Sequence, residues 1–250
     1  MPASEITTTM GTAMAEGALF DLLSWMSPAW PIGAFAHSSG LEWAVEAGLS
    51  TDRASTEAWL RDLVEHGALW NDAVAFVHAH RAALAGDGER LLEIAELSVA
   101  MLTSHERRVE STAQGAAFRR IACATADPPR HGEDPGYAFL LAPIADEDLA
   151  YPIAAATLFA THEIALAPAL TAFLHGAVAN LVSAAQRLIP LGQTDGQRVL
   201  RGLRPDILAA VDRAAAASDG DPFDAMGSAC LMADIACIAH ETQYTRLFRT

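Results

Sequence analysis

The sequence predicts an all-α protein, and three observations support this. Its 250 residues are rich in Ala, Leu, Glu and Arg, which favour helix. No segment alternates apolar and polar residues with the period of a strand. Short polar turns separate segments with apolar residues at helical spacing. We expect one bundle-like domain of about ten helices over residues 17–240, after a flexible segment at 1–16 and before a C-terminal tail at 241–250.

The first predicted helix covers residues 17–26 and ends before Pro28. The next one carries Ser39 and Glu42 at the Ser-x-x-Glu spacing of a capping box, and Gly48 is a plausible end for it. Because the capping box satisfies free N–H groups at a helix start, this spacing predicts a helix that begins near Ser39, although a start near Gly33 stays open.

The middle of the chain continues the helical pattern. Residues 52–85 read as two helices with a break near Gly67, and a further helix follows the turn at 86–88. The segment "DPPRHGEDPG", residues 127–136, is the clearest loop. Residues 137–167 predict two or three short apolar helices.

The last third begins with the cleanest amphipathic segment, which predicts a long helix over 168–189. Further helices are expected at about 194–216 and 222–240. None of the apolar runs, which His162, Pro168 and other residues interrupt, reaches the roughly 20 residues of a membrane span.

Charge and composition exclude several function classes. The net charge is −15 and the pI about 4.8, which disfavours nucleic acid and anionic membranes as partners. All sixteen basic residues are arginine, so no phosphate-loop, Schiff-base or general-base lysine exists. The start of the chain lacks a signal-peptide pattern, and three cysteines do not form a disulfide framework. We therefore expect a cytoplasmic protein.

The octet "PLGQTDGQ", residues 190–197, resembles a phosphate loop only superficially. It has no lysine, and Asp195 would repel phosphate. Helix caps explain it better: Gly192 suits a position after the preceding helix, and Thr194 with Gln197 has capping-box spacing. That interpretation leaves Gln193 and Asp195 free for a protein contact.

Cysteine and histidine offer a weaker alternative. Cys230 and Cys237 are seven residues apart on one predicted helical face, and His240 follows. A soft-metal site is conceivable there, but buried cysteines that pack as small apolar residues are more common. We interpret the charged segment 105–108, "HERR", as a solvated or interfacial helix face, and no acid–base pair for catalysis stands out.

The C-terminal tail "HETQYTRLFRT" combines aromatic, aliphatic and basic residues, unlike a typical loose terminus. Such a tail should be docked. It either packs on its own core or inserts into a partner, because Tyr and Arg are frequent interface anchors.

Three stretches together resemble the urease accessory protein UreF family. They are "SPAWPIGAFAHSSGLEWAVEAG" near the start, "LVSAAQRLIPLGQTDGQRVL" in the second half and "HETQYTRLFRT" at the end. A fourth stretch, "SHERRVESTAQGAAF", is similar as well. The chain departs from the family's usual pattern at Ala36, His37 and His105.

The resemblance implies an all-α, dimeric, non-catalytic protein without a cofactor or metal of its own. It implies binding to UreD (also called UreH), recruitment of the GTPase UreG, and delivery of nickel to the urease apoprotein. It also implies a set of residues at partner surfaces or in their scaffolding: Gly33, Glu42, Gln193, Thr194, Asp195, Gln197, Glu241, Tyr244, Arg246, Leu247, Phe248 and Arg249. Two alternatives stay open, namely a small all-α Cys/His enzyme and a direct nickel-binding protein.

Overall fold

A computed structural model describes residues 17–33, 36–125, 135–217, 220–227 and 229–249. These residues form α-helices and one short 3-10 helix and contain no strand, which confirms the all-α fold. The elements are α1 (Ala18–Trp25), α2 (Leu41–Glu46), α3 (Arg53–His66), α4 (Ala68–Leu84), α5 (Gly88–Ala100), α6 (His105–Thr125), α7 (Tyr137–Leu141), η1 (Asp146–Asp148), α8 (Tyr151–Thr161), α9 (Leu166–Leu188), α10 (Gln193–Gly202), α11 (Arg204–Ala217), α12 (Pro222–Ala225) and α13 (Leu231–His240).

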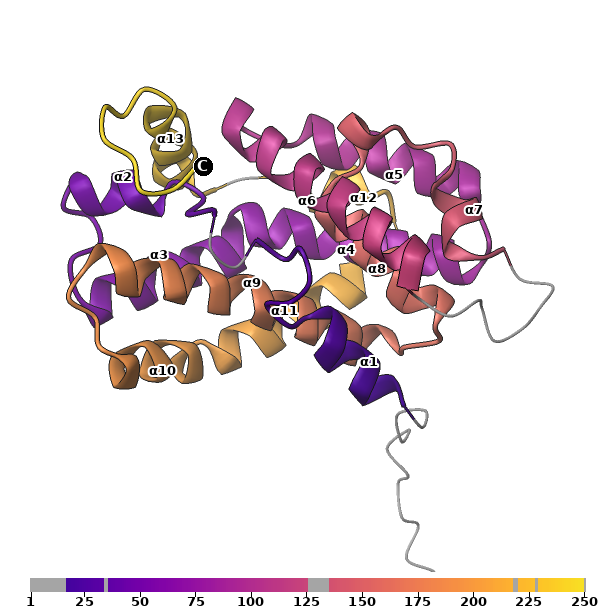
Figure 1. Cartoon of the computed structure of the whole chain (residues 1–250), viewed down its shortest axis with the longest axis horizontal. Coiled ribbons are helices and arrows are strands. Elements are labelled where there is room, and N and C mark those ends of the chain that lie inside the picture. Colours follow the sequence, from indigo (N-terminus) through magenta and orange to yellow (C-terminus); the bar gives the residue numbers. More distant parts are fainter. Residues whose placement is uncertain (1–16, 34–35, 126–134, 218–219, 228, 250) are drawn as a thin grey trace, which may run out of the picture.

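The helices form an elongated bundle around α4, α8 and α9 (Figure 1). Helix α8 lies between α4 and α6, while α11 packs against both α4 and α9. Ten of the eleven residues of α8 are buried, so this helix is apolar on all sides rather than amphipathic. That explains why residues 137–167 read as apolar runs without a clear face.

Aromatic side chains join the central helices. The ring of Phe76 on α4 lies 6.0 Å from that of Phe159 on α8 and 5.1 Å from that of Phe173 on α9. Trp25 of α1 stacks on Phe159 with 5.6 Å between centroids. These contacts connect α1, α4, α8 and α9 at the pair spacings that aromatic rings prefer.

Several predicted boundaries agree with the structure, including the first helix, the break at Gly67 and the long helix α9. Two segments that were each expected to form one continuous helix instead form two helices each. Residues 194–216 form α10 and α11, which meet at Leu203, because Pro205 has no N–H for the bond that a continuous helix would need. Residues 222–240 form the separate helices α12 and α13.

The length of helix α9 contradicts the expectation that no apolar run reaches the roughly 20 residues of a membrane span. Pro168 lies in its first turn, where proline is tolerated, so the helix continues for 23 residues. By length and composition alone, it is long and apolar enough to cross a membrane. In the structure it packs against α2, α3, α4, α8, α10 and α11, as the core helix of a bundle does.

Two sequence predictions lie wholly or largely outside the described residues. They are the flexible segment at 1–16 and the loop at 127–136, of which only 135 and 136 are described.

Helix α6 approaches the segment before α8 very closely at Gly115. A Cβ atom at this position would lie 2.0 Å from the carbonyl oxygen of Leu149, which is backbone and has little freedom to shift. Only glycine allows this contact between the two elements.

We predict that Gly115→Ala destabilises the protein by about 1–3 kcal/mol, the usual cost of overpacking. Gly88→Ala is the matched control, because an added Cβ there meets nothing within 4 Å. Urea unfolding measures both. Equal stability of the two variants would contradict this account of the α6 contact.

Candidate functional site

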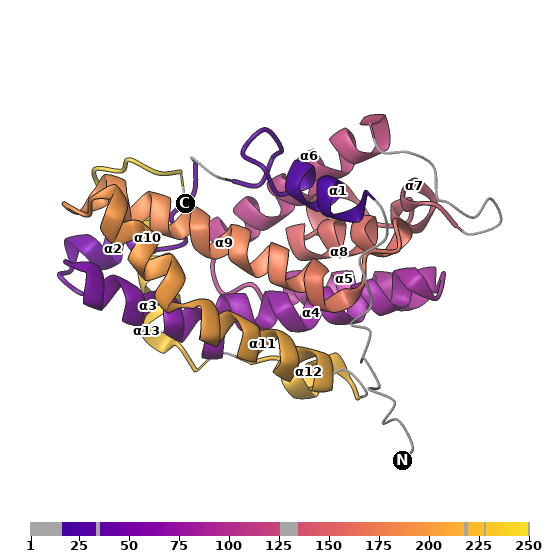
Figure 2. The same ribbon diagram turned by 90° about the horizontal axis from the view of Figure 1, so that it is seen from below.

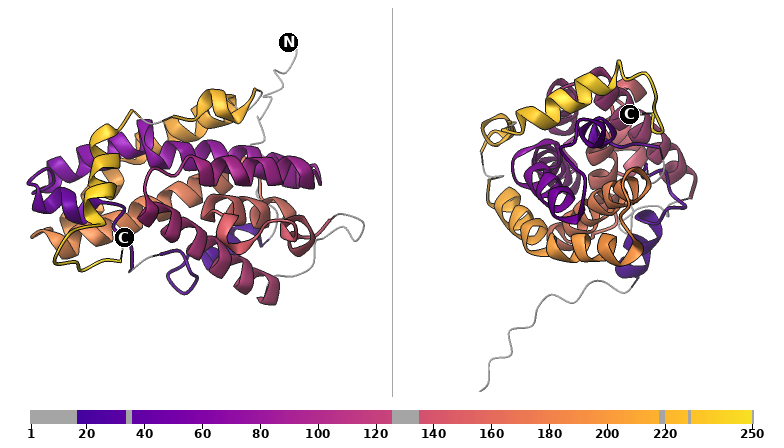
Figure 3. Two further views of the ribbon diagram at one scale, coloured as in Figure 1. Left: turned by 90° about the horizontal axis from the view of Figure 1, so that it is seen from above. Right: turned by 90° about the vertical axis from the view of Figure 1, so that its left-hand side faces the viewer.

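The C-terminal tail folds back from the end of α13 and lies beside α2 (Figures 1 and 3). The backbone N–H groups of Leu247 and Phe248 donate to the carboxylate of Glu42, at 2.6 and 2.9 Å. The N–H of Arg249 donates to the carbonyl of Ala36 at 2.9 Å. The tail backbone is therefore held at three successive residues.

His240 is fully buried between two carboxylates. Its Nδ1 lies 2.6 Å from an oxygen of Glu106 on α6, and its Nε2 lies 3.2 Å from an oxygen of Glu42 on α2. Arg246 donates to the second oxygen of Glu106 at 2.7 Å. The His240 ring therefore links the two carboxylates, and Glu106 also accepts from the Arg246 guanidinium, so each buried carboxylate has hydrogen-bond partners.

Glu241 extends the same arrangement to the start of α6. Its carboxylate accepts from the N–H groups of His105 and Glu106, at 2.8 and 3.3 Å. The first N–H groups of a helix have no partner inside the helix, and a negative charge there is favourable. Glu241 thus caps α6 from a residue more than 130 positions away in the chain.

Phe248 closes the tail with an apolar contact. It is 4% exposed and belongs to a small apolar cluster with Leu41, Ala184, Ala185, Ile189 and Leu191. The guanidinium of Arg187 lies 4.2 Å from the centre of its ring, within cation–π distance. Of the two alternatives for the tail, packing on its own core is therefore the one observed for Phe248.

Two tail side chains point the other way. Tyr244 is fully exposed and Leu247 is 62% exposed. On the adjoining α13, the exposed apolar residues Leu231, Ile235 and Ile238 lie at helical spacing on one face. The tail and α13 thus present an outward surface of aromatic and aliphatic side chains, which we call the tail surface.

The octet turn differs from the capping scheme expected for it. Helix α10 begins at Gln193, with Gly192 at its N-cap and no side-chain cap. Thr194 already lies inside the helix, so its capping-box pairing with Gln197 does not form. Gly192 has a φ of −70° and precedes α10 rather than ending α9 in a left-handed conformation.

Asp195 is not free, contrary to expectation. It lies in the first turn of α10, where an acidic side chain is favourable, and accepts from Arg198 at 2.9 Å. Gln193 lies within 3.5 Å of the amide nitrogen of Gln186 on α9. The octet therefore has structural contacts at both residues while Thr194 and Gln197 remain exposed.

Several residues of the segment 27–48, the first stretch that carries the family resemblance, also make structural contacts. Gly33 has a φ of +76°, and a Cβ there would lie 2.3 Å from the amide nitrogen of Gln114. Ser39 does not cap α2, because that helix starts after Gly40. Its hydroxyl instead lies beside the Arg107 guanidinium, which donates to it at 3.0 Å. Glu42, expected at a partner surface, is 7% exposed and binds the tail.

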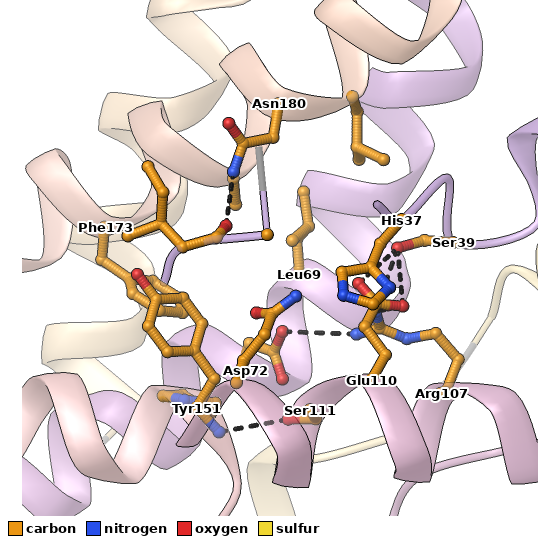
Figure 4. Close-up of a pocket in the computed structure, with 16 residues that line it drawn as sticks. His37, Ser39, Leu69, Asp72, Arg107, Glu110, Ser111, Tyr151, Phe173 and Asn180 are labelled. Carbon is orange, nitrogen blue, oxygen red and sulfur yellow. Dashed lines mark hydrogen bonds and ion pairs between the residues drawn. The ribbon is translucent and has the colours of Figure 1, made fainter. Parts of the chain in front are cut away.

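A second buried charge cluster lies under this stretch, in a cavity of about 60 Å³ (Figure 4). Arg107 contacts Glu110 at 2.7 Å and Asp72 at 3.7 Å. Burial raises the pKa of Asp72 to about 6, although Arg107 acts in the opposite direction. Burial alone would lower the pKa of Arg107, but Glu110 and Asp72 hold it above its ordinary value.

The interpretation of segment 105–108 as a solvated face is wrong for its two central residues. Glu106 and Arg107 are buried, whereas His105 and Arg108 are exposed. Each buried charge has partners from distant elements, which compensates for its loss of water. The sequence suggested His240 only together with Cys230 and Cys237, and it predicted neither this cluster nor the carboxylate partners of His240, since those partners lie far away along the chain.

The two cysteines and His240 are not brought together as a site. Cys230 precedes α13 and its thiol donates to the carbonyl of Asp62 at 3.0 Å, while His240 binds Glu42 and Glu106. Burial raises the pKa of Cys237 to about 12 and that of Cys230 to about 11, so both thiols are protonated at neutral pH. In the described part of the chain no three His, Cys, Asp or Glu side chains are grouped to hold a metal ion.

We predict that Glu42→Gln loosens the tail and lowers the unfolding free energy by on the order of 3 kcal/mol, because the neutral amide leaves His240 poorly paired. Carboxypeptidase should then release the last residues faster than from the wild type. Glu46→Gln, on the exposed side of the same helix, is the control. An unchanged release rate would show that Glu42 does not hold the tail.

Asp72 predicts a specific pH dependence. Its folded-state pKa of about 6 exceeds the ordinary 3.8, so the folded protein binds an extra proton between these values. Its contribution to stability is therefore lost as pH rises through that window. Asp72→Asn imitates the protonated form, and its stability relative to the wild type should increase by up to about 3 kcal/mol between pH 4 and pH 7. Denaturant unfolding at both pH values measures this, and a constant difference would contradict it.

The chain is similar to known proteins over nearly its whole length. The model of the UreF family matches residues 50–204. A "Urease accessory protein UreF" of Rhodopseudomonas palustris (strain HaA2) is 47% identical over 244 residues, which is 97% of this chain and 98% of the relative. The protein of that name from strain BisB5 is 48% identical over 246 residues, covering 98% and 97% of the two chains. One from Bradyrhizobium sp. (strain BTAi1 / ATCC BAA-1182) is 47% identical over 239 residues, or 96% of this chain and 95% of the relative.

Proposed function

The chain belongs to the UreF family of urease accessory proteins, and from this premise we propose that it is a non-catalytic scaffold of urease maturation. In this proposal it works in the cytoplasm as a homodimer and binds UreD (UreH). The complex recruits the GTPase UreG and delivers nickel to the urease apoprotein.

The observation that carries the proposal is the preorganised tail surface. Hydrogen bonds from two backbone N–H groups to Glu42 hold the tail backbone, and the Arg246 side chain donates to Glu106. Phe248 anchors the tail in a small apolar cluster. Tyr244 and Leu247 remain exposed, as do the apolar residues Leu231, Ile235 and Ile238 of α13. A rigid exposed aromatic–aliphatic surface is what a protein interface requires, because little conformational entropy is lost on binding.

The same contacts divide six of the proposed partner residues into two groups. Glu42, Glu241, Arg246 and Phe248 hold the tail in place, and we assign them scaffolding roles. Tyr244 and Leu247 face outward, and we assign them direct contact with UreD. A regulator that recruits a GTPase needs no nucleotide site of its own, which agrees with the absence of lysine from the chain.

We predict that Tyr244→Ala weakens binding to UreD at least tenfold, as expected for loss of an aromatic anchor. Its folding stability should change by no more than about 0.5 kcal/mol, because the side chain is fully exposed. Co-purification of the co-expressed proteins and titration by biolayer interferometry measure the effect. Point variants are preferable to removal of the tail, since its buried residues support the fold.

Phe139→Ala is the matched control, because Phe139 is an exposed aromatic residue on α7 at the opposite end of the bundle (Figure 1). It should leave binding unchanged. A wild-type protein that binds neither UreD nor UreG would overturn the proposed function. Equal affinity of wild type and Tyr244→Ala would remove Tyr244 from the interface.

A further inference from the structure

The corner formed by the end of α9, α10 and the start of α11 is basic, although the protein as a whole is acidic. Residues 187–204 contain four arginines and one acidic residue, a net charge of +3, whereas the whole chain carries −15. Arg187 and Arg198 are exposed, as are Arg201 and Arg204. Positive charge is thus concentrated in 18 residues of a strongly negative chain.

The outer face of α10 combines this charge with the octet. Thr194, Gln197, Arg198 and Arg201 lie within about 100° of one another around the helix axis. All four are exposed, whereas Gly196 and Val199 on the opposite face are buried against the bundle. The polar residues of the octet and two arginines therefore form one continuous surface, which we call the α10 surface.

Neighbouring carboxylates neutralise only part of this surface. Glu57 of α3, which lies against Gly202, pairs with Arg61 at 3.0 Å and with Arg53 at 3.8 Å. Asp206 of α11 pairs with Arg61 at 3.2 Å. Asp195 pairs with Arg198 and orients it along the helix. Glu57 and Asp206 thus pair with arginines outside residues 187–204, and after the charge of Asp195 is subtracted these residues keep a net charge of +3.

This corner is distinct from the tail surface. Both lie at the same end of the molecule, with α10 on one side and α13 with the tail on the other (Figures 1 and 2). Phe248 contacts the residues between α9 and α10, so the two surfaces are joined through the apolar cluster under the tail. Their chemistry nevertheless differs, since one is aromatic and aliphatic and the other is arginine-rich.

We propose that the α10 surface binds a carboxylate-rich surface of a protein partner in the maturation complex, with Arg198 and Arg201 as the charged contacts and Thr194 and Gln197 as hydrogen-bonding neighbours. The inference rests on the proposed function and deepens it, because it states the chemistry of one partner's surface. An acidic protein surface is the occupant that charge complementarity selects. Nucleic acid is disfavoured because the rest of the chain would repel it.

The test uses the double variant Arg198→Gln with Arg201→Gln and the stronger Arg198→Glu with Arg201→Glu. Gln is a good helix former, so the first variant keeps α10 intact even if charge reversal disturbs it. Binding to purified UreD and to purified UreG is measured by interferometry at 50 and 300 mM NaCl. Arg120→Glu, an exposed arginine of α6, is the control.

We expect wild-type affinity for one of these proteins to fall with salt. The Gln variant should lose about tenfold in affinity at 50 mM NaCl, the Glu variant more, and both should lose much of the salt dependence. The Arg120→Glu control should retain both. Tyr244→Ala should weaken binding to UreD without altering how that binding depends on salt.

Unchanged affinity and salt dependence in both α10 variants would overturn the inference while leaving the proposed function in place. An effect confined to self-association in analytical ultracentrifugation would overturn it as well, because the surface would then meet a second copy. The same holds for an effect confined to binding of duplex DNA. Failure of the wild type to bind either protein would instead count against the proposed function.

Discussion

The buried carboxylate of Glu42 is the group on which the arrangement of the C-terminal region depends. It accepts hydrogen bonds from two tail amides and lies within hydrogen-bond distance of His240, so α2, α13 and the tail share one charged centre. Glu106 joins α6 to the same centre through His240 and Arg246. A carboxylate in such surroundings is stable only when donors face it from several sides. The helices that supply those donors are thereby fixed relative to one another.

This constraint determines which residues remain available to other molecules. His240, which faces both carboxylates, is fully buried, whereas the side chains of Tyr244 and Leu247 are exposed. Phe248 also packs against Ile189 and Leu191, which precede α10, so the position of the tail is coupled to the start of that helix. One end of the bundle therefore presents both an apolar surface and a basic one in a fixed arrangement. In a scaffold that assembles several proteins, such an arrangement would set their relative positions.

The sequence predicts the fold well where a signal is local. Apolar spacing identified α9, glycine identified the break between α3 and α4, and helix-favouring composition identified the class. Local signals also misled. The Ser39–Glu42 and Thr194–Gln197 spacings imitate capping boxes, but tertiary contacts use Ser39 and Glu42 for other partners, and α10 begins before Thr194.

The burial of the charged residues could not be predicted from neighbouring residues in the sequence. Nothing in "HERR" distinguishes an exposed helix face from one whose central residues contact His240, Arg246 and Asp72, which come from α13, the tail and α4. The tail was recognisable as unusual, because a terminus with Tyr, Phe and Arg should dock somewhere. Whether it docks on its own core or on a partner depends on a carboxylate some 200 residues earlier, which only the folded arrangement reveals.

Native-state hydrogen exchange of the tail amides tests the central claim most directly. The N–H groups of Leu247 and Phe248 donate to a buried carboxylate and should exchange slowly in the isolated protein, with protection comparable to amides in the middle of α6. The amide of Tyr244 should exchange orders of magnitude faster. Rapid exchange at all three positions would contradict the account, because it would mean that the tail is not held by Glu42 before a partner binds.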